Sequence, residues 1–387
     1  MTAATAPVLA PLPWNRPLIG EDDIASVVAT LRSGWLTHGP NASAFEQAVR
    51  EDLGVGVADA FAVSSCTAAL HLALLAAGIG PGDEVITPSL TFCAAPNAML
   101  NTGARPVFVD VEPTTLNIDP DATRAAITPR TKAIVAMHYG GHPCDLRALR
   151  RLADEHGLLL VEDAAHALLA WRDGLRAGSV GDLAVFSFYA NKVLTSGEGG
   201  MLVGRADLVA KARLLGRHGI DSSAWKRHGK GNTADYDVTV PGLKYVMSDL
   251  NAALGLSQHR KLAAFTARRA EIAASYTTAL ADLPGLTTPA VLPGVQHGWF
   301  LYPVLVDPAA APLDRTCLAE RLQTEHQIAT SIHFRPVHTR QVYRDTARHS
   351  LPVTERAAAR QLSLPCNPAM TDHDVDRVIS AVRTQWT

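Results

Sequence analysis

Several features that mark other protein classes are scarce in this 387-residue chain. Its five cysteines are odd in number, widely spaced and free of any C-x-x-C pair, so we expect neither a disulfide framework nor a zinc ribbon. They are Cys66, Cys93, Cys144, Cys317 and Cys366. Basic and acidic residues nearly balance, 35 against 37, and the net charge is −2. This balance argues against nucleic acid or an anionic membrane as a partner.

The chain also lacks a long apolar run. The longest weakly polar stretch, residues 68–80, contains His71 and is too short to cross a bilayer. The first 13 residues lack the basic start of a signal peptide. We therefore expect a cytoplasmic enzyme with no membrane partner.

Common nucleotide and metal motifs are absent from the sequence. No P-loop occurs, and the glycines of residues 78–82 have the wrong spacing for a dinucleotide-binding G-x-G-x-x-G. His138 and His142 are four residues apart, which on a helix would suit a metal. The glycines between them and Pro143 after them indicate a loop instead. No metal site is predicted.

Seven short apolar runs follow one another in the first half of the chain. Most are continuous rather than alternating, which is typical of strands buried on both faces. The runs are 61–64, 84–87, 106–110, 133–137, 158–161, 184–188 and 201–203. Helical stretches such as 67–77 and 146–156 separate several of them. Strands alternating with helices predict an α/β fold with a seven-stranded, mostly parallel sheet.

The pattern changes after residue 205. A polar, irregular stretch over 221–240 predicts a long loop, and 248–269, continuing towards 281, predicts one long helix. The remaining segments predict a strand, a helix, a strand and a helix, at 299–306, 317–326, 329–334 and 372–384. We expect an N-terminal segment with a large domain over 1–245 and a smaller C-terminal α+β domain over 246–387.

Lys192 is the most informative residue of the sequence. It is a lone lysine within FSFYANKVLTSGEGG, residues 186–200, after an aromatic strand and before a glycine-rich loop. This setting predicts a held, partly buried amine, whereas the alternative is an ordinary surface lysine. A desolvated lysine with a lowered pKa is the usual partner of an aldehyde cofactor in a Schiff base.

Other chemically distinct groups follow the ends of neighbouring strands, where ligands bind in open α/β sheets. Thr67 and Ala68 begin a helix after the first strand, where backbone N–H groups form a phosphate cradle. The alternative is an ordinary helix cap. Phe92 follows the second strand and offers a face for a flat heteroaromatic ring, or is a core aromatic.

Asp163 follows the fifth run and suits a partner for a pyridine nitrogen, although a helix cap is the alternative. His166 is either a ligand of a phenolic oxygen or a core histidine. Ser187 lies five residues before the lysine. A phosphate cradle, a stacking ring, a pyridinium partner and a Schiff-base lysine together match pyridoxal 5′-phosphate, PLP.

These residues lie within a longer series of motifs. They are SGWLTHGP at 33–40, GPGDEVITPS at 80–89, EDAAHA at 162–167, the lysine segment, MSDLNAALG at 247–255 and SIHFRP at 331–336. From Pro13 to about Arg383 the chain resembles the DegT/DnrJ/EryC1/StrS sugar aminotransferases, which are fold type I PLP enzymes. The resemblance implies a transaminase with L-glutamate and 2-oxoglutarate as donor and product.

The resemblance also implies roles for single residues. Lys192 binds the cofactor and shuttles the proton, Asp163 pairs with the pyridine nitrogen, His166 lies near the phenolic oxygen and Phe92 stacks on the ring. Thr67, the Ala68 backbone and Ser187 hold the phosphate. Residues 242–247 reach the neighbouring subunit's cofactor, which implies a homodimer with shared active sites. One departure is Cys66, where the family usually has glycine and less often alanine. The other is Lys244 with Val246, beside Tyr245, where many members have an asparagine. Lys244 is the candidate to replace that asparagine at the cofactor phosphate as a point charge.

The family resemblance narrows the substrate as well. Related dehydratases replace the lysine with histidine, so Lys192 favours transamination. The chain is more similar to the branch that aminates C4 of nucleotide-linked 4-keto sugars, such as UDP-4-amino-4-deoxy-L-arabinose–oxoglutarate aminotransferase. Alternatives are a nucleotide-sugar dehydratase, a C3 aminotransferase or a non-catalytic PLP-binding regulator. Candidate substrate contacts are Trp35, Thr37, Lys226, Arg227, His333 and Arg335. The expected product is an aminosugar for a bacterial secondary metabolite, such as an antibiotic, or for a surface glycan.

Overall fold

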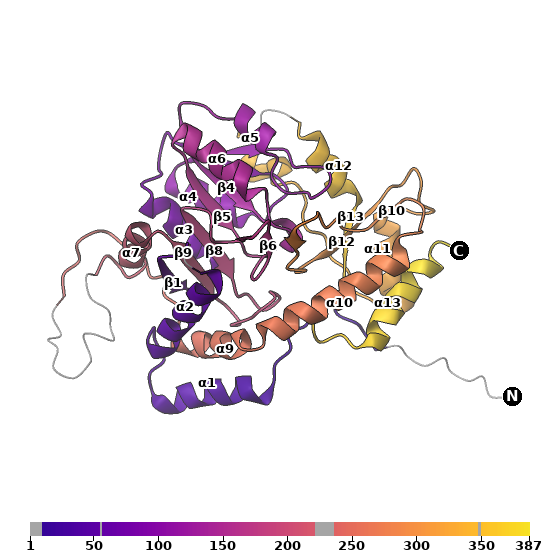
Figure 1. Ribbon diagram of the computed structural model, residues 1–387, viewed down its shortest axis with the longest axis horizontal. Coiled ribbons are helices and arrows are strands. Elements are labelled where there is room, and N and C mark those ends of the chain that lie inside the picture. The colour runs from indigo at the N-terminus through magenta and orange to yellow at the C-terminus, as the bar shows by residue number, and fades with distance from the viewer. Residues whose placement is uncertain (1–9, 55, 221–235, 347–349) are drawn as a thin grey trace.

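The computed structural model describes residues 10–54, 56–220, 236–346 and 350–387. The chain forms a large α/β part and a smaller α+β part, joined by the long helix α10 (Leu262–Leu280) that runs diagonally in Figure 1. The large part contains the cofactor-binding candidates, and the smaller part covers one side of them.

The large part is built on a seven-stranded sheet with the order β1-β9-β8-β5-β4-β2-β3. Its strands are β1 (Asp59–Val63), β2 (Glu84–Pro88), β3 (Arg105–Val109), β4 (Thr131–Met137), β5 (Leu159–Asp163), β8 (Leu183–Ser187) and β9 (Gly200–Gly204). Only β9 runs against its neighbours, since it pairs antiparallel with both β1 and β8. The prediction of seven mostly parallel strands is therefore confirmed, and each predicted run lies on one of these strands.

Helices cover both faces of this sheet. The helices of this part are α1 (Glu21–Ser33), α2 (Pro40–Leu53), α3 (Cys66–Ala76), α4 (Ala94–Thr102), α5 (Pro120–Ala125), α6 (Leu146–His156), α7 (Ala206–Leu215) and α9 (Asp249–His259), with a short 3-10 turn η1 (Tyr139–Gly141). Among them, α1 makes its main contacts with α9 and lies away from the sheet (Figure 1). Helix α6 shows how the local sequence determines where a helix begins and ends and which face it buries. Asp145 caps its N-terminus by accepting from the Ala148 N–H at 2.9 Å, and Gly157 ends it in the left-handed region. Its Leu149 and Leu152 are buried, as an amphipathic helix requires.

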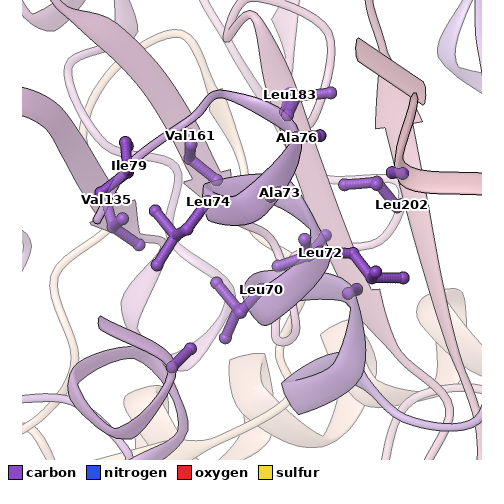
Figure 2. Close-up of a cluster of buried hydrophobic side chains, with 14 of the residues drawn as sticks. Leu70, Leu72, Ala73, Leu74, Ala76, Ile79, Val135, Val161, Leu183 and Leu202 are labelled. Atoms are coloured by element: carbon purple, nitrogen blue, oxygen red, sulfur yellow. The ribbon is translucent and has the colours of Figure 1, made fainter. Parts of the chain in front are cut away.

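Helix α3 is different because it is apolar on nearly all sides. Leu70, Leu72 and Leu74 are at most 1% exposed and point in different directions from its axis, and all three pack in one cluster with strand residues such as Val161 and Leu202 (Figure 2). A helix buried all round is held rigidly by packing. Its N-terminus, at Cys66, is therefore fixed relative to the carboxyl ends of the strands.

The smaller part has its own core around a three-stranded sheet, β10-β12-β13. Its elements are α10, β10 (Leu286–Thr287), β12 (Tyr302–Val306), α11 (Arg315–His326), η2 (Val337–Thr339), η3 (Gln341–Tyr343), α12 (Pro352–Arg360), β13 (Gln361–Leu364) and α13 (Asp372–Thr384). A small sheet of β11 (Val295–Gln296), β6 (Trp171–Arg172) and β7 (Leu175–Arg176) links the two parts. Leu12 from the N-terminal segment also packs in the smaller core.

Two predicted elements differ in the structure. The long helix expected from residue 248 is two helices, α9 and α10, which are separated by Arg260 and Lys261. Two polar contacts hold the chain at this break: Lys261 Nζ pairs with Asp23 at 2.5 Å, and His259 Nε2 forms a hydrogen bond with Asp52 at 2.7 Å. The strand expected over 329–334 is wrong as well, since only Ser331 pairs there, in an isolated bridge with Ser363. The rest of that segment forms a wall of the candidate site. None of the described helices is long and apolar enough to cross a membrane.

Candidate active site

A cavity of about 320 Å³ lies at the carboxyl ends of β5 and β8. Seven predicted site residues line it: Thr67, Phe92, Asp163, His166, Ser187, Lys192 and His333. The sequence reasoning did not single out several others that line it, among them Met137, Tyr189, Asn191, Glu198, Phe300 and Phe334. Residues from both parts of the chain thus converge, as the strand-end argument predicted for the large part.

Lys192 lies in the loop that follows β8. Its backbone N–H donates to Tyr189 O at 2.9 Å, and Ser196 N–H donates to Phe188 O at 2.9 Å, so the loop folds back on itself. The side chain is partly buried, and its Nζ lies 4.2 Å from the centre of the Phe300 ring. Burial lowers the pKa of Lys192 to about 8, although the Asp163 carboxylate opposes this shift. The predicted held amine is confirmed, and the surface-lysine alternative is wrong.

Asp163 is the last residue of β5 and is 4% exposed. No helix follows it, so the helix-cap alternative is wrong, and its Oδ1 accepts from Ala165 N–H at 3.1 Å within a turn. Burial raises the pKa of Asp163, and the Ala165 N–H and the nearby Lys192 oppose that shift. The carboxylate is therefore held in place, and its oxygens can still accept hydrogen bonds from a cationic partner in the cavity.

His166 packs between aromatic rings on the same side of the cavity. Its ring centre lies 4.3 Å from that of Phe300 and 6.0 Å from that of Phe334, with Phe334 nearly parallel. Burial holds the pKa of His166 well below its usual range, so the imidazole is neutral. Its Nδ1 makes no hydrogen bond to any described residue, which leaves that nitrogen available to a ligand.

The N-terminus of α3 forms the opposite end of the cavity. Ser65 is the N-cap, and its Oγ accepts from the Ala68 N–H at 3.1 Å. The capping interpretation is thus confirmed for Ser65, and the Ala68 N–H already has a partner. The N–H groups of Cys66 and Thr67 belong to the first turn, where a helix has no internal acceptor. A phosphate bound at this terminus would meet these two groups, the Thr67 hydroxyl and Ser187.

Gly200 allows this end of the site to close tightly. A Cβ built on Gly200 would lie 2.5 Å from Cys66 N and 2.5 Å from Ser65 C. These are backbone atoms, so β9 approaches the start of α3 more closely than any side chain permits. The glycine therefore sets the position of the helix N-terminus against the sheet.

Phe92 lies at the opening of the cavity with 54% of its surface exposed, so it is not a core aromatic. Its ring centre is 5.9 Å from that of Phe334. The two rings come from β2–α4 and from the smaller part of the chain. They leave apolar faces on both sides of the opening.

A buried network lies behind Asp163. His138 Nε2 donates to Glu162 at 3.0 Å, and its Nδ1 accepts the Cys144 N–H at 3.0 Å. A nitrogen that accepts from a backbone N–H carries no proton, so this geometry describes a His138 ring with its proton on Nε2. His138 thus has a structural partner for both nitrogens. Among the described residues, no group of three or more histidine, cysteine or acidic side chains is arranged to hold a metal ion.

The predicted substrate contacts have different positions. His333 is buried in the cavity wall, where its Nδ1 contacts Ser363 Oγ at 3.0 Å and Trp14 packs on its ring. Burial and the nearby Lys192 lower the pKa of His333 to about 3. Trp35, Thr37, Lys244 and Arg335 do not line this cavity. Lys226 and Arg227 lie outside the described residues.

A mostly parallel α/β sheet with a buried lysine and a buried carboxylate at its strand ends defines a fold type I PLP enzyme. A model of the DegT/DnrJ/EryC1/StrS aminotransferase family matches residues 17–383. The spore coat polysaccharide biosynthesis protein SpsC of Bacillus subtilis is 47% identical over 376 residues, 96% of each chain. The chain therefore belongs to the DegT/DnrJ/EryC1/StrS aminotransferase family and is a PLP-dependent sugar aminotransferase.

Solved structures agree with this assignment. The aminotransferase TlmJ from Streptoalloteichus hindustanus is 39% identical, with a TM-score of 0.89 over 97% of this chain and 99% of that one. DesI, solved in the presence of its TDP-sugar product, is 37% identical, with a TM-score of 0.86 over 97% of this chain and 92% of DesI.

The residues present fit PLP. Asp163 is buried with unfilled acceptor capacity, His166 has a buried nitrogen without a described partner, and the start of α3 offers free N–H groups. Asp163 suits the ring nitrogen, His166 the phenolic oxygen, Lys192 the aldehyde carbon and Thr67 with Ser187 the phosphate.

Proposed function

We propose that this enzyme aminates C4 of a nucleotide-linked 4-keto sugar, with L-glutamate as the amino donor. The observation that carries the proposal is the joint placement of Lys192 and Asp163 in one cavity. The family membership and the TDP-sugar product of DesI support a nucleotide sugar as acceptor. The polysaccharide role in the name of SpsC supports a surface glycan as the destination, and a secondary metabolite is the other. Cytoplasmic location stays a prediction.

The roles of the residues follow from their surroundings. When bound, PLP supplies a carbonyl group for the amino group and a ring that stabilises negative charge on the adjacent carbon. Asp163 holds the proton at the ring nitrogen, because an anionic carboxylate stabilises a neighbouring cation. Lys192 removes a proton from the α-carbon of glutamate and later donates one to the sugar carbon. A lysine with a pKa of about 8 is suited to both transfers near neutral pH.

The substrate enters past the aromatic opening. His333 lines the inner wall of the cavity, is uncharged, and is positioned by Ser363 and Trp14. A neutral imidazole suits hydrogen bonding to a sugar hydroxyl or keto oxygen rather than to a phosphate. We assign His333 to the sugar and not to the diphosphate.

The diphosphate of the substrate requires further cations. Among the described residues that line the cavity, Lys192 is the only lysine or arginine. We propose that a second copy of the chain completes the site in a homodimer, with the exposed Lys244 reaching the partner's cofactor phosphate. Arg335 and residues 226–227 are the other candidate cationic contacts.

The central experiment incubates purified protein with PLP and then with sodium borohydride. Peptide mass spectrometry should find the reduced cofactor on Lys192, and Lys192→Ala should carry none. The protein is then given L-glutamate and a panel of UDP- and dTDP-linked 4-keto pentoses and 6-deoxyhexoses. Formation of an aminosugar with an equal amount of 2-oxoglutarate supports the proposal. Sugar turnover without 2-oxoglutarate indicates a dehydratase, and a protein that takes up no PLP overturns the assignment of the site.

A further inference from the structure

The Phe300 ring is the surface against which the Lys192 amine rests. The Nζ atom lies 4.2 Å from the ring centre, within the distance at which an ammonium group and an aromatic face attract each other. Phe300 is 2% exposed, so water does not separate it from the amine on its buried side. The attraction acts on the ammonium form, because the face of the ring carries negative charge density and the neutral amine gains little from it.

The position of the Phe300 ring is fixed by its backbone. Arg269, 1% exposed, donates Nη1 to Trp299 O at 3.2 Å, to Phe300 O at 3.4 Å and to Cys366 O. The next residue, Leu301, donates its N–H to Gly140 O at 3.0 Å. A buried guanidinium and a backbone bond to η1 therefore hold the segment from both sides. The ring is rigid before any ligand binds.

The other groups around the amine do not replace this contact. Asp163 is the charged group that favours the ammonium form of Lys192, and it is the predicted partner of the cofactor nitrogen. Burial raises the pKa of the Cys66 thiol well above its usual value, so Cys66 is uncharged beside the amine. His166 and His333 are neutral on the same side of the cavity, and Glu198 and Tyr189 line it nearer the surface. Once Asp163 faces the cofactor, the ring of Phe300 is the remaining buried group that favours a protonated lysine.

We propose that Phe300 is the positioning residue of Lys192: its aromatic face holds the ammonium form whenever the amine is not bonded to the cofactor. The step balances simply. Lys192 takes a proton from the α-carbon of the donor, the ammonium group rests on Phe300, and the proton would then pass to the carbon of the bound cofactor that receives the amino group. In the second half of the reaction the amine would take a proton back from that carbon, rest again on Phe300 as the ammonium form, and donate the proton to the sugar carbon. The inference depends on the assigned role of Lys192, which borohydride reduction tests separately.

The experiment measures the titration of Lys192 itself. The full chain is loaded with pyridoxamine 5′-phosphate, so that Lys192 carries no covalent bond, and is labelled with trace acetic anhydride between pH 6 and 11. Peptide mass spectrometry gives the labelling midpoint of each lysine. We expect Phe300→Leu to lower the Lys192 midpoint by roughly 0.5–1 pH unit relative to wild type, because the leucine fills space without an aromatic face. Phe300→Tyr should leave the midpoint near the wild-type value.

Two comparisons separate this role from packing. Phe45 lies in the same hydrophobic cluster as Phe300 but on α2, so Phe45→Leu is the matched control and should not move the Lys192 midpoint. Ring-fluorinated phenylalanines at position 300 keep the shape while they weaken the negative face, and should lower the midpoint stepwise with each fluorine. A Lys192 midpoint that is the same in wild type, Phe300→Leu and the fluorinated series overturns the proposal. That result leaves the borohydride assignment of Lys192 unaffected.

Discussion

Glu162 and Asp163 are consecutive residues at the end of β5, yet their carboxylates have opposite surroundings. Glu162 is fully buried and accepts N–H groups from Gly178, Val180 and Gly181 at 2.6–2.8 Å, together with His138 Nε2. Asp163 accepts one backbone N–H, from Ala165. Alternation along the strand sends the first carboxylate into the protein and the second into the cavity. The first is saturated and structural, and the second keeps acceptor capacity for a ligand.

This contrast predicts that Glu162→Gln mainly lowers stability. A glutamine at this position presents an amide NH₂ to two of the existing donors, so buried N–H groups lose their acceptor. We expect the free energy of unfolding to fall by about 3–5 kcal/mol in urea denaturation at pH 7. Glu155→Gln, at an exposed ion pair with Arg124, should leave the free energy of unfolding nearly unchanged.

The stability that Glu162 supplies should decrease as the pH falls. The His138 and backbone hydrogen bonds lower the pKa of Glu162 below 4.5 despite its burial, so the folded state binds fewer protons than the unfolded one. This stabilisation is present above the unfolded pKa of 4.5 and is lost as the pH falls below it. The difference in free energy of unfolding between wild type and Glu162→Gln should therefore decrease below pH 4.5. If the two proteins differ in free energy of unfolding by the same amount at pH 7 and at pH 3.5, the stabilising role of the ionised Glu162 carboxylate is contradicted.

Asp163→Asn should have the reverse effect. Burial raises the pKa of Asp163, so its ionised form costs stability in the cofactor-free protein, and a neutral amide removes that cost. We expect the variant without cofactor to unfold at the same temperature as wild type or higher. Single-turnover reaction with glutamate should slow by at least ~10²-fold, because the stabilising charge at the ring nitrogen is lost. An unchanged rate would remove Asp163 from the proposed role.

The sequence predicted the parts of the fold and site that rest on local patterns. Continuous apolar runs identified every strand of the main sheet because strands buried on both faces have few polar positions. Lys192, Asp163 and His166 were found because strand ends in such sheets converge on one edge. The break at Arg260 has no glycine or proline, since it depends on polar contacts with distant α1 and α2 residues. No local signal could have revealed it.

Phe300 shows a second limit of sequence reasoning. Residues 299–306 read as a strand, and an aromatic residue near the start of such a run resembles any core residue. Its importance comes from Lys192, which is distant in the sequence, and from Arg269, which fixes its carbonyl. The strand predicted over 329–334 is absent for a similar reason. His333 O accepts a hydrogen bond from the Tyr139 hydroxyl, and the His333 ring contacts Ser363. These distant partners hold the segment in the cavity wall and not in a sheet.

Gly200→Ala should disturb both the fold and the phosphate end of the site. The added Cβ would overlap Cys66 N and Ser65 C, which cannot move without shifting α3. We expect a loss of about 1–3 kcal/mol of stability and weaker PLP binding in fluorescence titration. Gly80→Ala is the control, because its Cβ would lie 3.7 Å from the nearest atom, Thr102 O. Equal PLP affinity in Gly200→Ala and wild type would argue against a phosphate at this helix terminus.

The lowered pKa of Lys192 predicts how cofactor uptake depends on pH. Only the neutral amine attacks an aldehyde, and burial lowers the pKa of this amine to about 8. The rate of covalent PLP attachment to the cofactor-free protein should therefore rise with pH, with a midpoint near pH 8, and level off at higher pH. Stopped-flow absorbance gives the rate at each pH. A midpoint near 10.5, the value of an ordinary lysine, would show that the amine is solvated.

Shared active sites predict that two inactive subunits can restore activity together. Lys244 is exposed and lies outside its own cavity, and we propose that it contacts the partner's cofactor phosphate. Lys192→Ala and Lys244→Ala chains, co-expressed with different tags, pair at random, so about half of the dimers are mixed. Each mixed dimer then has one site with both lysines intact and one with neither.

At limiting PLP, where Lys244→Ala alone is inactive, the mixture should show roughly a quarter of the wild-type rate. Lys192→Ala mixed with Lys132→Ala, an exposed lysine at the start of β4, should give about half. No recovery in the first mixture, with about half in the second, would place Lys244 outside the partner's site.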